Sequence, residues 1–364
     1  MKTLKSVIIL TLFIFSLSAI FSCVKKDLIE YDGITYEFVE EHDFYDGSVE
    51  RYYSVESVPR DLTEVTIPDK IGEFEVKSVY PSAFKNCTKL KSVSLPDGVT
   101  FINVRAFENC TSLTELKLPN ELEYIDRGAF IGCTNLSKIS IDENNQHFKV
   151  IDNVVYSKDG QELVLYPSGK QEQYFKIPEG VTKIKGYAFY GACFESVEIP
   201  YGVKSIFSYA FENCQNLSSI ELPDSVQFLD DSVFEDCKKL KSVVLSKNLK
   251  EIPRRAFIDC RSLESISIPD NIESIQGEAF ANCTSLKSIF IPNTVQKINF
   301  EAFANCSSLK SIFIPNTVQE VDYDAFENCD NLTIYCEAKS KPQKWHRRWS
   351  GNAKVVWGAT APTE

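Results

Sequence analysis

One short sequence occurs twice in this chain, and this repetition constrains the fold more than any other feature. Residues 280–295 read FANCTSLKSIFIPNTV and residues 303–318 read FANCSSLKSIFIPNTV, a shift of 23 positions. A related pattern recurs along most of the chain: an Ala-Phe pair (once Val-Phe), an aliphatic residue five positions before the phenylalanine and, in nine of ten units, a cysteine three positions after it. Its phenylalanines are Phe84, Phe107, Phe130, Phe189, Phe211, Phe234, Phe257, Phe280, Phe303 and Phe326. Such a period indicates stacked repeats, because one unit cannot bury its own apolar side.

The consensus L-x-x-I-x-I-P-x-x-V-x-x-I-x-x-x-A-F-x-x-C-x-x predicts two kinds of element in each unit. The I-x-I-P segment alternates with a period of two and is ended by proline, so it predicts a short strand. The A-F-x-x-C segment is too short for a stable isolated helix, so we expect a one-turn helix held by its neighbours. Roughly eleven coils, about 4.8 Å apart, would align equivalent side chains in a rod about 50 Å long.

The repeat unit resembles the bacterial leucine-rich repeats of the BspA-like type, from about Leu62 to Leu332. In the ten units, nearly every consensus position is filled by its expected residue type. The resemblance implies an α/β repeat solenoid that is rich in β-structure, with short strands and one-turn helices. It also implies a surface protein without catalytic activity.

An insertion interrupts the expected solenoid, which we assign to residues 61–336. The spacing between Phe130 and Phe189 rises to 59 residues, and the additional segment includes FKVIDNVVYSKDGQELVLYP at 148–167. Two alternating runs, Val150 to Tyr156 and Glu162 to Tyr166, surround an Asp-Gly pair and predict a β-hairpin. We therefore expect a hairpin insertion at 142–176 within a single domain.

The two exposed ends of a repeat stack need covers. Residues 23–60 are expected to form a linker and an N-terminal cap, in which residues 32–39 and 51–58 are short strands that pair with the first coil. Residues 337–364 are expected to form a C-terminal cap. This segment holds Trp345, Trp349 and Trp357, the three tryptophans of the chain, which a lid on the last apolar row explains better than a ligand cage.

The N-terminus MKTLKSVIILTLFIFSLSAIFSC has two lysines and then an uncharged apolar run, which predicts a signal peptide at residues 1–22. The sequence Ile20 to Cys23 resembles a bacterial lipobox, in which Cys23 becomes the acylated first residue of a membrane-anchored lipoprotein. A plain signal peptide or an uncleaved anchor is the alternative. We expect the protein in the cell envelope, with the outer membrane or cell surface favoured. Residues 24–27 (VKKD) lack the acidic cluster associated with surface export of lipoproteins, so a periplasm-facing placement stays open.

Composition and motifs argue against nucleic acid, a cofactor and catalysis. The chain has 39 Lys+Arg against 51 Asp+Glu, a net charge of -12, and no long basic stripe that could bind phosphates. The three histidines, His42, His147 and His346, lie outside the regular repeats, and no H-E-x-x-H, G-x-S-x-G or glycine-rich phosphate loop is present. We expect no enzyme; a site in the hairpin insertion is the weakest alternative.

Cysteine recurs once per coil and not in the C-x-x-C pairs of zinc sites, so we expect no metal site. Exported proteins usually pair their thiols. Parallel side chains in register do not point at one another, however, so we expect a reduced, buried row of cysteines. Cys193 and Cys336 lie off this row and are the candidates for disulfide pairing.

The outward positions of the strands form the candidate binding surface. Strand alternation sends Phe290 and Phe313 outward, each preceded by a serine, Ser288 or Ser311, and Val244 occupies the same position in an earlier unit. A serine row beside these apolar side chains is how an open sheet presents a contact patch. Alternatively, Phe290 and Phe313 form a cross-strand pair that only stabilises the sheet.

These observations and the resemblance predict an exported, non-catalytic adhesin that binds a protein or glycan of a host or neighbouring cell through its strand face. The alternative is a structural or scaffold lipoprotein of the cell envelope, whose rod shape is its function.

Overall fold

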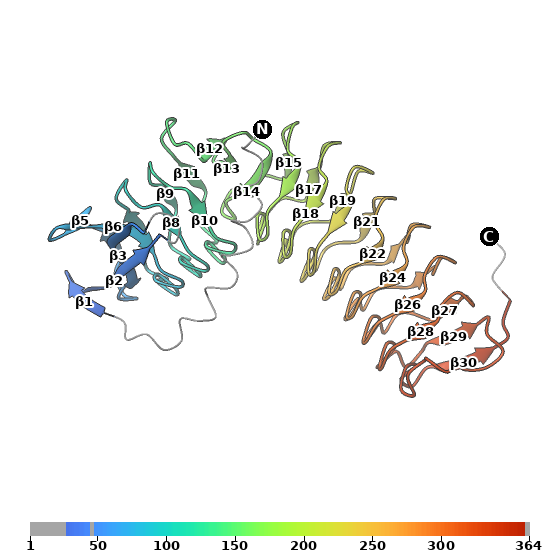
Figure 1. Cartoon of the computed structure of the whole chain (residues 1–364). Coiled ribbons are helices and arrows are strands. Elements are labelled where there is room, and N and C mark those ends of the chain that lie inside the picture. The colour runs from blue at the N-terminus through green and yellow to red at the C-terminus, as the bar shows by residue number, and fades with distance from the viewer. Residues whose placement is uncertain (1–26, 44–46, 361–364) are drawn as a thin grey trace.

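The computed structural model describes residues 27–43 and 47–360, so the expected signal peptide and the acylated Cys23 lie outside the described residues. The described chain is a β-solenoid of about 13 turns with a repeat of about 23 residues. Its coils follow one another along a curved rod from β1 (Asp27–Tyr31) to β30 (Lys354–Trp357) (Figure 1). The roughly eleven expected coils were too few, because strands at both ends extend the stack. In the part that the structure describes, no helix is long and apolar enough to cross a membrane.

Most coils contribute one strand to each of two rows, in which paired neighbours run parallel. The first strand row contains β4 (Glu64–Thr66), β7 (Ser92–Ser94), β9 (Glu115–Lys117), β11 (Lys138–Ser140), β15 (Tyr174–Lys176), β17 (Ser196–Glu198), β19 (Ser219–Glu221), β21 (Ser242–Val244), β23 (Ser265–Ile266), β25 (Ser288–Ile289), β27 (Ser311–Ile314), β29 (Thr333–Cys336) and β30. The second strand row contains β3 (Val49–Ser57), β6 (Phe74–Val79), β8 (Phe101–Ile102), β10 (Tyr124–Ile125), β14 (Glu162–Leu165), β16 (Lys183–Ile184), β18 (Ser205–Ile206), β20 (Phe228–Leu229), β22 (Glu251–Ile252), β24 (Ser274–Ile275), β26 (Lys297–Ile298) and β28 (Glu320–Val321). Equivalent residues meet in register: Ile275 pairs with Ile252 on one side and Ile298 on the other.

The N-terminal end of the rod is covered by antiparallel strands. β1, β2 (Ile34–His42) and β3 pair in this order, and β3 continues in parallel onto β6, which β5 (Lys70–Ile71) flanks. The rings of Phe38, Tyr53 and Phe74 lie 5.0–6.3 Å apart between these strands. This packing ties the first strands to the stack.

Phenylalanines of successive coils stack in the core in two runs, Phe84 to Phe130 and Phe189 to Phe326, and the expected alignment is confirmed within each run. The ring centroids of Phe211, Phe234, Phe257 and Phe280 lie 5.3–5.4 Å from their neighbours, with ring planes within 19° of parallel. All four side chains are fully buried. Each ring therefore covers the next coil's ring, and burying these large apolar surfaces stabilises the rod as a whole. We call these two runs of stacked rings the phenylalanine stack.

The expected one-turn helices are wrong: the described residues contain no helix. The residues two before and two after each repeat phenylalanine have positive φ, as in Arg105 (56°) and Asn109 (60°) around Phe107. Left-handed residues interrupt a right-handed helix. The backbone N–H groups of this segment donate to carbonyl oxygens of the next coil instead. The N–H of Phe107 donates to Ala129 O and that of Asn109 to Ile131 O, both at 2.8 Å.

The sequence carried a signal for these left-handed turns. The position two after the phenylalanine is asparagine, aspartate or glycine in all ten units, and these residues adopt positive φ most readily. Their amides also form side-chain ladders between coils, for example Asn305 Nδ2 to Asn282 Oδ1 at 2.8 Å and Asn328 Nδ2 to Asn305 Oδ1 at 2.9 Å.

The insertion forms three antiparallel strands: β12 (Phe148–Ile151), β13 (Val154–Ser157) and β14. The run from Val150 to Tyr156, expected as one strand, is two, because Asp152 and Asn153 form a turn with φ of 50° and 65°. The hairpin at Asp159-Gly160 joins β13 to β14, as the sequence predicts. β14 then pairs with β16 and returns the chain to the second strand row.

The insertion also divides the core into two clusters. Phe130 belongs to the N-terminal cluster, and Tyr166, in the C-terminal cluster, lies 5.4 Å from Phe189. Tyr166 therefore takes the place of a phenylalanine in the coil that lacks the A-F-x-x-C segment.

The three tryptophans close the C-terminal end. Trp349 lies edge-on against Phe326 with ring centroids 6.0 Å apart, and Trp345 lies 4.7 Å from Trp349. Trp357 contacts both at 5.9 and 6.1 Å, and Trp345 Nε1 donates to Val318 O at 3.2 Å. Trp345 and Trp349 are buried, so their rings act as a lid on the last coil.

All eleven cysteines in the described residues are free thiols. In eight coils the thiol lies 3.0–3.2 Å from the carbonyl oxygen of the preceding coil's phenylalanine, as in Cys260 and Phe234. Burial raises the pKa of Cys87 to about 11, which keeps this thiol protonated. The geometry is that of the expected buried row, and of the two off-row cysteines Cys336 is buried and Cys193 half-buried.

Candidate functional site

The five side chains expected to form a contact surface all lie on the first strand row. Phe290 (52% exposed) and Val244 (55% exposed) project from its outer face. Phe313 is half-buried, and Ser288 and Ser311 are exposed. Phe290 and Phe313 occupy neighbouring coils, whereas Val244 lies two coils away from Phe290. The structure therefore brings the two rings and their serines together and leaves Val244 apart.

The apolar surface continues further than the sequence predicted. Tyr335 in β29 pairs in register with Phe313 and is 40% exposed, and Val356 in β30 pairs with Tyr335. We call Phe290, Phe313 and Tyr335 the aromatic column. Tyr335 was missed because one residue is lost after Leu332, which breaks the 23-residue count. The alternation I-Y-C, equivalent to I-F-I in the coil before, was the available signal.

An open hollow of about 450 Å³ lies in the same coils, between their strands of the first and second rows. We call it the amide groove, and the side chains that line it, besides Glu273 of the preceding coil, are Asn293, Thr294, Gln296, Thr317 and Gln319. Their coils are joined by a hydrogen bond from the N–H of Gln319 to Gln296 O at 2.8 Å. Two residues separate Phe290 from Asn293 in the chain, so the groove and the aromatic column share coils, although no ring of the column lines the groove.

The polar groups in and beside the groove differ in their exposure and in their hydrogen bonds. Thr294 Oγ1 is buried and has no hydrogen-bond partner among the described residues. The backbone N–H of Asn316, at the bend of the next coil, donates to Glu337 Oε2 at 2.8 Å. Asn293, Gln296, Thr317 and Gln319 are exposed. The groove thus presents amides and a hydroxyl to solvent on a backbone held by neighbouring coils.

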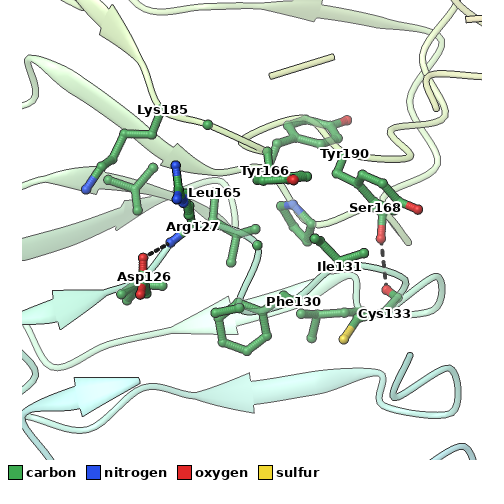
Figure 2. Close-up of a pocket in the computed structure, with 18 residues that line it drawn as sticks. Asp126, Arg127, Phe130, Ile131, Cys133, Leu165, Tyr166, Ser168, Lys185 and Tyr190 are labelled. Atoms are coloured by element: carbon green, nitrogen blue, oxygen red, sulfur yellow. Dashed lines mark hydrogen bonds between the residues drawn. The ribbon is translucent and has the colours of Figure 1, made fainter. Parts of the chain in front are cut away.

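A second cavity lies where the two core clusters meet (Figure 2). Phe130 and Ile131 line one side and Tyr166 and Ser168 the other, and Ser168 Oγ donates to Cys133 O at 2.9 Å. Its volume is about 40 Å³, room for a few water molecules at most. The cavity is the gap left by the missing A-F-x-x-C segment, and it is too small for an organic ligand.

The titratable groups do not point to catalysis. Burial and the neighbouring Glu235 and Asp236 carboxylates raise the pKa of Glu212 to about 7, and Arg255 pairs with Glu235 at 2.9 Å. Such a shift is expected wherever like charges stack one coil apart at half-buried positions, so it does not by itself mark an active site.

The histidines and possible metal ligands are likewise dispersed. His42 lies in β2, His147 directly before β12, and His346 in the C-terminal segment. Within residues 27–43 and 47–360, no group of three or more His, Cys, Asp or Glu side chains could hold a metal ion.

Comparisons with known proteins agree with this architecture. A family model described as BspA type leucine rich repeat region matches residues 57–158, 166–287 and 273–341. A solved leucine-rich repeat protein from Eubacterium ventriosum is similar with a TM-score of 0.62 and 20% identity, over 88% of this chain and 97% of that one. The pneumococcal vaccine antigen PcpA is similar with a TM-score of 0.51 and 18% identity, over 93% of this chain and 100% of that one. At such identities the likeness concerns the fold. No curated protein matches this chain in sequence.

Proposed function

This chain belongs to the BspA-type leucine-rich repeat family, and on that premise we propose that it is a non-catalytic adhesin. The chain is exported by the signal peptide at residues 1–22 and anchored in the membrane through acylated Cys23. Its rod then carries the first strand row to a protein or glycan of a host or neighbouring cell.

The exposed aromatic column is the observation that supports binding. A strand residue that faces solvent is normally polar, yet Phe290 and Tyr335 are about half exposed. Exposed apolar patches of this kind mark interaction sites more often than chance positions do, and aromatic side chains contribute most to contact energies. Val244 extends the same face at a distance of two coils.

Attachment of cells that display the full chain tests this role. The double variant Phe290→Ser, Phe313→Ser removes two rings of the column at exposed or half-buried positions, so it should leave the fold unchanged. We expect weaker attachment to epithelial monolayers and to cells of a second bacterial species. The matched control is Phe101→Ser, Tyr124→Ser, which removes two exposed rings 6.2 Å apart on the second strand row. Attachment that is equal for both variants and the wild type would remove the aromatic column as the contact surface.

Protease added to intact cells tests the placement. Cleavage of the solenoid on whole cells is expected for a surface adhesin. If the solenoid stays intact on whole cells and is cut after lysis, the envelope-scaffold alternative is favoured and the adhesin role fails.

A further inference from the structure

We propose that the amide groove and the adjoining aromatic column form a binding site for an uncharged glycan chain. This inference rests on the proposed binding role of the first strand row and narrows its partner to one chemical class. Three features carry it: a local loss of charge, the chemistry of the groups that replace the charges, and their repetition in neighbouring coils.

Charged side chains are absent from two positions at which most other coils carry them. Ten residues before the next repeat phenylalanine, the two coils of the groove have asparagine, at 293 and 316. Five other coils have Asp97, Glu179, Asp224, Lys247 and Asp270 there, and three have the uncharged Phe74, Asn120 and Tyr201. Seven residues before that phenylalanine, the two coils have glutamine, at 296 and 319. Five other coils have Lys77, Glu123, Lys204, Lys250 and Glu273 there, and three have the uncharged Thr100, Thr182 and Gln227.

The outward strand position changes in the same coils. Phe290 and Phe313 stand where some earlier coils have Lys117, Glu198 and Glu221 and others have the uncharged Ser94, Ser140, Val244 and Ser267. Duplication of one unit explains why the two coils resemble each other. What distinguishes these two coils is that all three positions are uncharged together, whereas each other repeat coil has a charged residue at one or more of them.

The replacing groups suit a neutral sugar. Each hydroxyl of a sugar both donates and accepts a hydrogen bond, and the amides of Asn293, Gln296 and Gln319 offer both donors and acceptors. The apolar C–H face of a sugar ring packs against the electron-rich face of an aromatic ring, which Phe290 presents three residues before Asn293. Removing these uncharged groups from water also costs less than removing the charged side chains of other coils.

An anionic glycan fits the surface less well. Its recognition needs arginine or lysine side chains directed at the acid groups, and none lines the groove, whereas Glu273 does. Lys287, which precedes the serine of β25, is already paired with Glu264 at 2.5 Å.

Repetition favours a chain of similar units over a single small molecule. Thr294 and Thr317 are equivalent residues of neighbouring coils, as are Gln296 and Gln319, and coils lie about 4.8 Å apart. Hydrogen bonds between the coils hold these pairs in register. Gln296 and Gln319 thus repeat one exposed amide in line, whereas Thr317 is exposed and the Thr294 hydroxyl is buried. The open hollow of about 450 Å³ spans both coils.

Affinity electrophoresis of the full chain tests the inference, with starch, yeast mannan and laminarin as neutral polysaccharides and heparin as the charged one. We expect at least one neutral polysaccharide to retard the protein and heparin to leave it unretarded. The triple variant Asn293→Asp, Gln296→Glu, Gln319→Glu places at these positions the acids that the preceding coil carries, so it should fold. Its binding should weaken about tenfold or more, a loss of about 1.4 kcal/mol.

Gln227→Glu is the matched control, since it makes the same change at the same repeat position three coils away. It should bind like the wild type. Three results would overturn the glycan site: only heparin retards the protein, no neutral polysaccharide retards it, or a neutral polysaccharide retards the triple variant as strongly as the wild type. If Phe290→Ser, Phe313→Ser still weakens cell attachment in that case, the adhesin proposal stands with a protein partner. If it does not, both proposals fail.

Discussion

Replacing Phe257 with alanine measures how much stability the phenylalanine stack supplies. Phe257 is fully buried, and its ring stacks on Phe234 at 5.4 Å and on Phe280 at 5.3 Å. Truncating a buried phenylalanine to alanine typically costs about 3–5 kcal/mol, from lost burial and from the cavity that remains. The neighbouring coils are hydrogen-bonded to each other and cannot collapse into the gap, so we expect the upper part of this range.

Urea unfolding of the full chain provides the assay, with far-UV circular dichroism reporting all coils and tryptophan fluorescence reporting the C-terminal lid. Long repeat arrays can depart from two-state unfolding, so the two signals are compared for each variant. Phe290→Ala is the control, because it truncates the same residue type at a half-exposed position two repeat units further on. It should change the free energy of unfolding by less than about 0.5 kcal/mol. Equal midpoints for the two variants would refute the role of the stack.

Three further predictions address the turns, the buried carboxylate and the thiols. Asn305→Ala should lower the free energy of unfolding by about 1–2 kcal/mol more than Asn305→Gly does, because alanine is strained at φ 60°. Urea titrations of the two variants measure this difference. An alanine variant as stable as the glycine variant would instead support a helical turn. The pKa of Glu212 is about 7 in the folded protein against an ordinary value of 4.5, so the wild type should lose stability as pH rises from 4.5 to 7. Glu212→Gln should flatten this part of the profile, and unchanged pH dependence of the urea midpoint would contradict the assignment. In the native protein at pH 8, a thiol reagent followed by peptide mapping should label Cys193 before the ten buried cysteines, and early labelling of Cys260 would show that the row is open.

The repeat, the aligned phenylalanines and the hairpin at Asp159-Gly160 follow from the sequence because each depends on period or on local turn chemistry. The helical turns were wrong for a physical reason. Taken alone, the A-F-x-x-C segment has no hydrogen-bond acceptor for its backbone N–H groups outside itself. In the stack, carbonyl oxygens of the next coil accept these hydrogen bonds, as Ala129 O does from the N–H of Phe107. The turn at Asp152-Asn153 had a local signal, since both residues tolerate positive φ.

The candidate site was only partly predictable. Alternation was sufficient to send Phe290 and Phe313 outward. Tyr335 was missed because a one-residue loss displaced it from the repeat count, and its place beside Phe313 comes from strand pairing. The amide groove was missed because Gln296 and Thr317 lie in different coils, and only the stacking of those coils places them in one hollow.

Deletion of one repeat unit tests the central claim, that successive segments of about 23 residues stack as equivalent coils. Removing residues 281–303 joins Phe280 to Ala304 and restores the sequence Phe-Ala-Asn-Cys at the junction. We predict a folded protein with the same dichroism per residue, the same tryptophan emission and a rod shorter by about 5 Å in small-angle scattering. Removing residues 281–292 instead leaves the coils after the deletion out of phase and should unfold them. An unfolded 23-residue deletion, or a 12-residue deletion that is equally well tolerated, would contradict the stacking of equivalent coils.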